Sequence, residues 1–429
     1  LVDAHLNDKS IPDPKKLMEY VIERNKDSLE RFFPDPESRK NLVDAVERLM
    51  VYATATGGLD LSKPLSFLDD DRKLLENTLE EDKLVSLIDF LNGGTQAHNY
   101  LEPLKPDIIG EYFVLDYIYQ RRRSDLCKEM VKACWKKPNG GLLFFLDRCT
   151  RSYLGDFPDL VFDKDSILFH GTHPLGEVAV LFGMTTTPDF DYRQKAVERI
   201  EEIYKENQEA MIPELYAKGL YNLLVKQEKV AARQTFEKLK MLNNQWSENP
   251  VIALAYARGT VIFLTNQKGI EACQIVNNLK KLSNQWSENS EIALAYAQSL
   301  VNYPAEQEEN SDCRHVIDEL KKLSEQWPEN PGIGVAYAMG LFNLFNKQEE
   351  TTARQTADEL KNFCNKRHEI LGFTLQLANI HAADIKKENK PDDNLEYTKL
   401  MQLIQSLKMI ADTLPIPDTK IYLTRKDDD

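Results

Sequence analysis

The residues best suited to chemistry in this sequence are a close histidine pair, His170 and His173. Imidazole nitrogens bind zinc, but a zinc site needs further ligands. The nearby carboxylates that could supply them are Asp159, Asp163 and Asp165. Because Gly171 lies between the histidines and Pro174 follows them, the segment is more typical of a turn. We therefore predict a loop here and no metal site.

Other catalytic signatures are missing from the sequence. Gly93-Gly94 and Gly140-Gly141 lack the Lys-Ser/Thr of a phosphate-binding loop, and no Gly-x-Ser-x-Gly occurs. The six cysteines form no Cys-x-x-Cys pair, and several lie among apolar helical residues. They are typical of small core residues in a reducing, cytoplasmic compartment. We expect no enzyme activity, no catalytic residue and no bound cofactor in this chain.

Charge and hydropathy narrow the classes of partner. The net charge of −15 repels phosphate backbones and so disfavours nucleic acid. No apolar run approaches the ~20 residues of a membrane span, which argues against a membrane protein. At 429 residues the chain is long enough for two or three domains. It begins at Leu1 without Met, so we expect a piece of a longer protein.

A repeat organises the C-terminal half. Gln-Trp-Ser/Pro-Glu-Asn recurs at Trp246, Trp286 and Trp327, which are 40 and 41 residues apart. A second marker, Tyr-Ala-x-Gly/Ser, keeps the same period at Tyr216, Tyr256, Tyr296 and Tyr337. Two markers with one period predict a structural repeat, in which we expect both the tyrosines and the tryptophans to belong to the core.

Each repeat is predicted to be a helix pair. The first helix carries small residues around the Tyr, and the second ends at the Trp before a Pro-containing break. This pattern resembles tetratricopeptide repeats, although about 40 residues per unit exceeds that family's ~34. A HEAT-like pair remains the alternative. About four units are recognisable, and the helix expected at Leu395–Leu414 could cap them.

Variable positions on the first helices predict the binding site. In a stack of helix pairs the first helices line a concave groove, where partners dock. Plain solvent exposure is the competing interpretation for each position. The partner-binding candidates, expected to contact another protein, are Lys218, Asn222, Arg258, Ile262, Gln298, Asn302, Met339 and Asn343.

The N-terminal part is predicted to be short helices with one small hairpin. We expect helices at Lys15–Phe33, Glu37–Thr56, Asp71–Leu79, Asp82–Leu91 and Ile108–Tyr119. A hairpin strand is expected at His98–Leu104, and Asp107 is expected to cap the helix that follows it. Short helices, a hairpin and a capped helix describe a winged-helix-like module.

Residues Leu101–Ile118, which read LEPLKPDIIGEYFVLDYI, resemble the winged helix of bacterial signal-transduction ATPases with numerous domains (STAND proteins). Residues Leu49–Leu59 are similar to the helix after that family's ATPase core. Ala133–Trp135 and Phe144–Cys149 are similar to its bridging helices. The resemblance implies an all-α chain with four parts: a winged-helix-like module over 1–120, a helical bridge over 121–190, a tetratricopeptide-like α-solenoid over 191–370, and capping helices with a tail over 371–429.

The resemblance also implies a function, the sensing of a phage protein in bacterial defence. An ATPase core and an effector would then precede Leu1, ATP or ADP would bind there, and the full-length protein could form a homo-oligomer. Animal and plant relatives of the family contact nucleotide through a Met-His-Asp motif. Here Asp107 matches its Asp, but Pro106 replaces its His. The alternatives are a stand-alone scaffold for cytoplasmic proteins and a winged-helix transcription regulator, and the net charge disfavours the latter.

Overall fold

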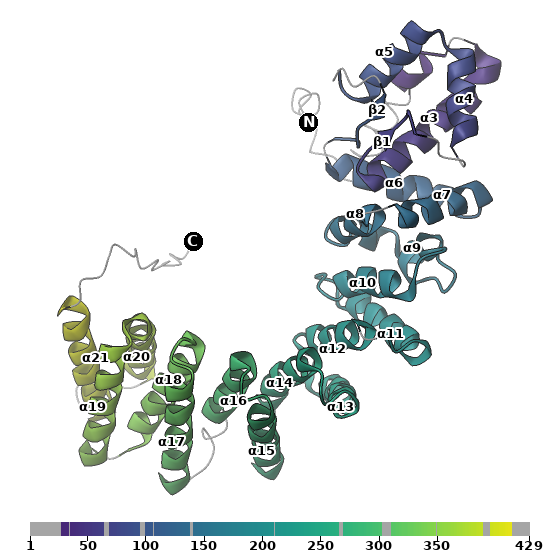
Figure 1. The fold of residues 1–429 in the computed structure, drawn as a ribbon. Helices are drawn as coiled ribbons and strands as arrows, with labels where there is room; N and C mark the ends of the chain where they lie inside the picture. Colours follow the sequence, from purple (N-terminus) through teal and green to yellow (C-terminus); the bar gives the residue numbers. More distant parts are fainter. Residues whose placement is uncertain are drawn as a thin grey trace. The chain divides into compact units, whose positions relative to one another are not determined.

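The described part of the chain is mostly helical (Figure 1). The chain divides into two compact units, Leu1–Lys226 and Gln227–Asp429. The boundary falls inside the predicted repeat region. No helix in the described part of the chain is long and apolar enough to cross a membrane. The computed structural model describes residues 27–33, 35–63, 68–94, 99–105, 107–137, 140–209, 211–265, 269–302, 310–348, 350–388 and 395–413.

Helix α3 (Pro36–Thr56) packs with both strands and with several helices in the N-terminal part of the first unit, and it confirms the helix predicted at Glu37–Thr56. The Asp35 carboxylate accepts hydrogen bonds from the amides of Glu37 and Ser38, at 3.3 and 3.2 Å, which caps the first turn. Gly57, at φ 79°, ends the helix in the left-handed conformation that glycine adopts without strain. Of the helix predicted at Lys15–Phe33, residues 27–30 are helical and those before 27 lie outside the described residues.

Two short strands pack with α3, but no tight turn joins them into a hairpin. Strand β1 (Leu59–Asp60) pairs antiparallel with β2 (Tyr100–Leu101), and helices α4 (Asp69–Thr78) and α5 (Glu81–Leu91) intervene. Of the strand predicted at His98–Leu104, His98 lies outside the described residues; within them the strand covers Tyr100–Leu101 and has a distant partner. The side chain of Asn92 holds this arrangement, because its amide donates to the Tyr100 carbonyl and its oxygen accepts from the Glu102 amide.

Helix α6 (Asp107–Gln120) follows β2 and confirms the helix predicted at Ile108–Tyr119. Asp107 is the first helical residue rather than the cap, and its side chain is exposed. A carboxylate in the first turn still interacts favourably with the helix dipole. Gly110 has no room for a side chain, because a Cβ there would lie 2.9 Å from the Leu104 carbonyl oxygen.

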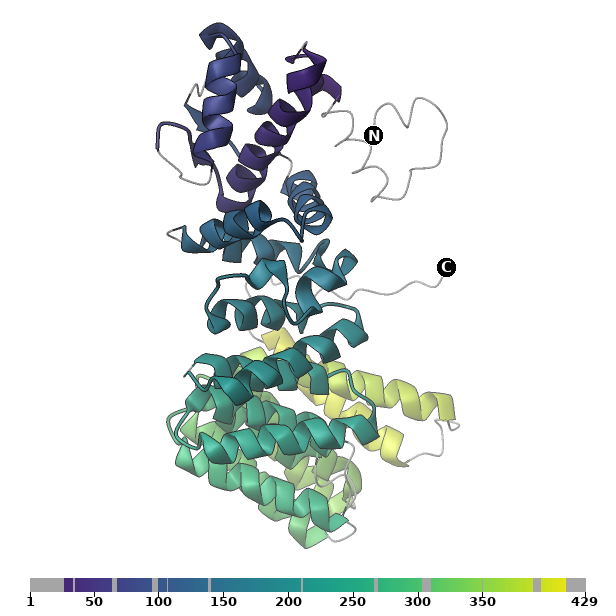
Figure 2. The ribbon, with the colours of Figure 1, turned by 90° about the vertical axis from the view of Figure 1, so that its right-hand side faces the viewer.

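The first unit continues with a series of further helices (Figure 2). Most of their buried residues are apolar. Trp135 lies on the first of these helices, and its indole nitrogen donates a hydrogen bond to the Leu168 carbonyl at 2.6 Å. The helices are α7 (Asp125–Lys136), α8 (Gly141–Cys149), α9 (Pro158–Phe162), α10 (Pro174–Met184), α11 (Phe190–Glu206) and α12 (Met211–Leu224), with single 3-10 turns at Leu154–Asp156 and Ile167–Phe169.

The second unit is a succession of helices. Alternate helices along the chain, from α14 to α20, pack against one another. Helix α14 contacts α16, α16 contacts α18, and α18 contacts α20, so these four form one continuous layer. The bounds are α13 (Lys229–Gln245), α14 (Pro250–Leu264), α15 (Gly269–Gln285), α16 (Ser290–Asn302), α17 (Asn310–Gln326), α18 (Pro331–Lys347), α19 (Glu350–Lys366), α20 (His368–Glu388) and α21 (Leu395–Thr413). The expected helix at Leu395–Leu414 corresponds to α21.

The repeated tyrosines are core residues, as predicted. Tyr256, Tyr296 and Tyr337 are all buried, as is Tyr216 in the first unit. The small residue three positions later lets a neighbouring helix approach, since a Cβ on Gly340 would lie 2.6 Å from the Leu320 side chain. Two of the tyrosine hydroxyls reach the next helix: that of Tyr296 donates to Glu319 at 3.4 Å, and that of Tyr337 to Glu359 at 2.7 Å.

The tryptophans are not the deep core residues that the sequence suggested. Trp246, Trp286 and Trp327 are half-buried and lie immediately after the last residues of α13, α15 and α17. Each backbone amide still donates to a carbonyl of the preceding turn, for example Trp246 to Leu242 at 3.0 Å. Because each ring lies at a helix end beside an exposed turn, it stays partly open to solvent.

The turns after the tryptophans explain the rest of the repeated motif. Asn249, Asn289 and Asn330 are N-caps whose side-chain oxygens accept from the second and third amides of the next helix, at 3.0 to 3.3 Å. The repeated glutamine links successive turns. Gln285 donates to the Ser247 carbonyl at 2.9 Å, and Gln326 to the Ser287 carbonyl at 3.5 Å.

Candidate functional site

A three-by-three set of side chains lies on the solvent side of α14, α16 and α18, and we call it the exposed array. On each helix its members are four residues apart, a spacing that puts them on one face. All nine are half-buried or exposed. The members are Leu254, Arg258 and Ile262 on α14, Leu294, Gln298 and Asn302 on α16, and Val335, Met339 and Asn343 on α18.

The three rows of the exposed array are adjacent because the helices that carry them pack together (Figure 1). Arg258 on α14 forms an ion pair with Glu291 at the start of α16, at 2.7 Å. Leu294 on α16 reaches the start of α18, since a Cβ on Gly332 would lie 2.9 Å from it. The array is therefore one continuous surface.

On each helix the first member of the array is aliphatic, and the chemistry of the second member differs from helix to helix. Leu254, Leu294 and Val335 repeat one chemistry, whereas the positions four residues later are Arg258, Gln298 and Met339. Partly exposed aliphatic residues beside polar ones are typical of surfaces that bind other proteins. The array thus offers a contact surface of mixed apolar and polar side chains, and no acid–base pair or nucleophile lies among its nine residues.

Six of the eight sequence-predicted site residues belong to the exposed array, and two do not. Lys218 and Asn222 lie on α12, in the first unit. Lys218 is exposed, but Asn222 is half-buried and donates from its amide to the Thr185 hydroxyl at 2.9 Å. That hydrogen bond joins α12 to α10, so Asn222 has a structural role.

Sequence reasoning missed the aliphatic members, Leu254, Leu294 and Val335. They were absent from the prediction because the comparison of repeats singled out positions that change between units. The available signal was their spacing: each lies four residues before a predicted contact, hence on the same helical face.

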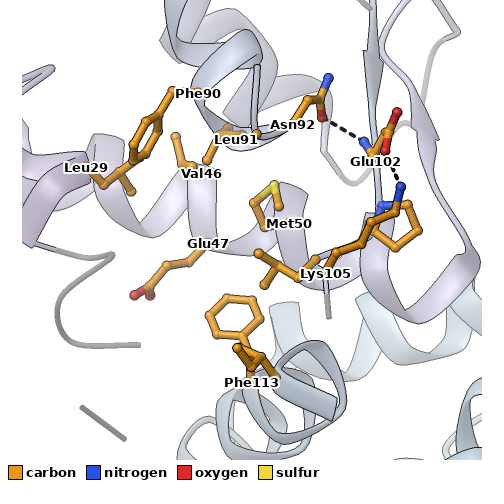
Figure 3. A pocket seen from close by; sticks show the side chains of 14 residues that line it. Leu29, Val46, Glu47, Met50, Phe90, Leu91, Asn92, Glu102, Lys105 and Phe113 are labelled. Atoms are coloured by element: carbon orange, nitrogen blue, oxygen red, sulfur yellow. Dashed lines mark hydrogen bonds and ion pairs between the residues drawn. The ribbon is translucent and has the colours of Figure 1, made fainter. Parts of the chain in front are cut away.

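The first unit contains a separate pocket of about 290 Å³ (Figure 3). Most of its lining is apolar: Met50 and Val46 come from α3, Phe90 from α5 and Phe113 from α6. The volume is close to the lower end of the range for small-molecule sites. Five chain segments contribute to the lining, which is why no local sequence signal indicated it.

The polar side chains around this pocket already have partners. Lys105 forms an ion pair with Glu102 at 2.6 Å, and this contact raises the pKa of Lys105 above its usual range. Glu47 pairs with Arg121 at 3.0 Å. The pocket therefore offers an apolar contact surface, with no unmet polar group to select a ligand.

The histidine pair lies in a turn, as the sequence indicated. Gly171 has φ 74°, in the left-handed region, and both histidines are exposed. The His173 ring nitrogen accepts from the Leu175 amide at 3.4 Å at the N-terminus of α10. His173 thus serves as a helix cap.

Searches against protein-family models, curated proteins and solved structures give no match for this chain.

Proposed function

We propose that this chain is the protein-binding sensor part of a STAND-type ATPase and that its tetratricopeptide-like α-solenoid recognises another protein through the exposed array. The observation that carries the proposal is the contrast within each repeat. The Tyr, small-residue, Gln and Asn positions keep their chemistry, whereas the middle position of the exposed array changes from the charged Arg258 to the amide Gln298 to the apolar Met339.

The energetics of the array suit reversible binding. Arg258 and Glu291 keep 47% and 46% of their side-chain surfaces exposed. An exposed pair of this kind contributes roughly 0.2–1 kcal/mol, so a partner can replace either ion at little cost. The half-exposed aliphatic side chains then supply the apolar area that favours association.

The finer part of the proposal rests on the resemblance of Leu101–Ile118 to the STAND winged helix. In this interpretation a phage protein binds the array more tightly in the open form of the full-length ATPase than in the closed form. Only such a difference in affinity can shift the equilibrium. Oligomerisation and the effector would follow that shift.

Site-specific photo-crosslinking tests the surface. A benzophenone amino acid replaces Gln298 in the array or, as a matched control, the exposed Gln274 on α15. The chain is expressed in bacteria that are then infected with phage. We expect a discrete crosslinked product of phage origin from position 298, reduced at least tenfold by Arg258→Glu, and none from position 274. Identical products from both positions would refute the proposed surface.

The scaffold alternative is distinguished by the reading frame upstream of Leu1. A phosphate-binding loop encoded there supports the STAND proposal. A start codon directly before Leu1, together with crosslinks to a host cytoplasmic protein in uninfected cells, supports a scaffold.

A further inference from the structure

The pocket of the first unit is bordered by two helices that each present a pair of apolar side chains to it (Figure 3). Val46 and Met50 on α3 are four residues apart, and so are Ile109 and Phe113 on α6. Residues at that spacing lie on one face of a helix. Helices α3 and α6 pack together, which fixes the two faces relative to each other. Phe90 on α5 adds a further apolar side chain.

These apolar side chains differ in how much surface they leave for a ligand. Val46 and Met50 are 1% and 3% exposed, so they close the inner wall and offer little further area. Ile109 and Phe113 are half-buried, and Phe90 keeps 41% of its surface exposed. A ligand in the pocket would remove these three outer side chains from water, which favours binding.

The polar side chains of the lining disfavour a charged ligand, because each of the four is already paired within the fold. Glu102 and Lys105 are 2.6 Å apart, and Glu47 is 3.0 Å from Arg121. Asn92 donates to one backbone carbonyl and accepts from one backbone amide. An ion entering the pocket would lose water without gaining an opposite charge, unless it broke one of these pairs. An uncharged ligand meets no such cost.

We propose that this pocket binds a small uncharged apolar molecule, which contacts Phe90, Ile109 and Phe113 and is selected by its shape and its lack of charge. The volume of about 290 Å³ is close to the lower end of the range for small-molecule sites, so the ligand is small. The site lies in the first unit and does not depend on the function proposed for the exposed array.

Fluorescence titration of the full chain with N-phenyl-naphthylamine tests the pocket, because this uncharged probe fluoresces strongly only in apolar surroundings. The comparison probe, anilinonaphthalene sulfonate, has the same rings and a negative charge. We expect saturable one-site binding of the uncharged probe, at least tenfold tighter than binding of the sulfonate. Added salt should not weaken it, because screening acts on charges. Equal or tighter binding of the sulfonate would overturn the proposal.

Two neighbouring isoleucines on α6 provide a matched pair of variants. Ile109 lines the pocket, whereas Ile108 is 45% exposed and lies outside the lining. Ile109→Trp fills the space and should weaken binding of the uncharged probe at least tenfold, whereas Ile108→Trp should leave it unchanged. Because filling a cavity commonly stabilises a protein, the urea midpoint of Ile109→Trp should not fall below that of wild type.

A second variant, Phe90→Ser, removes contact area instead of filling space. The side chain is partly exposed, so the fold should tolerate its loss, while affinity for the uncharged probe should fall about fivefold. This variant keeps the test open if Ile109→Trp fails to fold. Wild-type affinity in Phe90→Ser or in folded Ile109→Trp, equal weakening by Ile108→Trp, or no saturable binding at micromolar probe would each refute the site.

Discussion

Replacing Asn289 by alanine removes the cap at the start of α16 while leaving the side chains of the exposed array in place. The Asn289 oxygen accepts from the amides of Glu291 and Ile292, at 3.1 and 3.2 Å. Loss of an N-cap side chain costs about 1 kcal/mol, in a range of roughly 0.5–2. Each lost hydrogen bond contributes about 0.5–1.5 kcal/mol net, which leads to the same magnitude.

The assay is urea unfolding followed by tryptophan fluorescence. Trp246, Trp286 and Trp327 all lie in the second unit and are half-buried, so unfolding of that unit changes their surroundings. With an m value of about 2.5 kcal/mol/M, a loss of about 1 kcal/mol lowers the midpoint by about 0.4 M.

Two variants control the interpretation of this experiment. Asn289→Asp keeps an acceptor at the cap and adds a charge that favours a helix N-terminus, so it should unfold near the wild-type midpoint. Asn284→Ala changes an exposed asparagine inside α15 and should leave the midpoint within about 0.2 M. If Asn289→Asp destabilises as much as Asn289→Ala, or Asn284→Ala does so, the capping argument fails.

Two further predictions concern ion pairs. The Asp71 carboxylate is 10% exposed and accepts hydrogen bonds from Arg48 at 2.8 and 2.5 Å, so Arg48→Met leaves it without its partner and should lower the free energy of urea unfolding by about 3 kcal/mol. The double variant Arg48→Met/Asp71→Leu should recover most of that loss. Equal stability of the single and double variants would contradict this prediction. Burial tends to raise the pKa of Glu319, but the hydrogen bond and charge of Lys280 hold that pKa below its usual value. The stabilisation from this pair is therefore complete above the ordinary glutamate pKa and is lost as pH falls through the lowered value. The stability difference between wild type and Glu319→Gln should shrink between pH 6 and pH 3, and a difference independent of pH would refute the assignment.

Local patterns predicted the elements well where short-range physics decides them. Helix α3 has its Asp35 cap, its apolar face and its Gly57 terminus within one stretch of chain, so its bounds differ from the prediction by one residue. The tyrosines were assigned to the core because a large side chain beside small ones fits a close helix contact. These features depend on residues a few positions apart.

Long-range features were the ones that sequence reasoning missed. Strand β2 pairs with a strand that precedes two helices, and no local hydropathy pattern specifies such a partner. The tryptophans were assigned to the core from their repetition, yet the Asn caps and the glutamine bonds to Ser247 and Ser287 account for much of the same motif. The pocket of the first unit combines residues from separate segments, and its existence follows from packing.

The glutamine-to-carbonyl links have a consequence for how this protein can change length. Two successive turns offer equivalent acceptors, the carbonyls of Ser247 and Ser287, and α15 and α17 end with the same donor, a glutamine. Excising or duplicating one whole period therefore reconnects equivalent atoms, whereas an insertion of any other size does not. Growth by complete periods would extend the exposed array by three side chains at a time, so duplication of the coding segment could change the proposed binding surface without redesigning the interior.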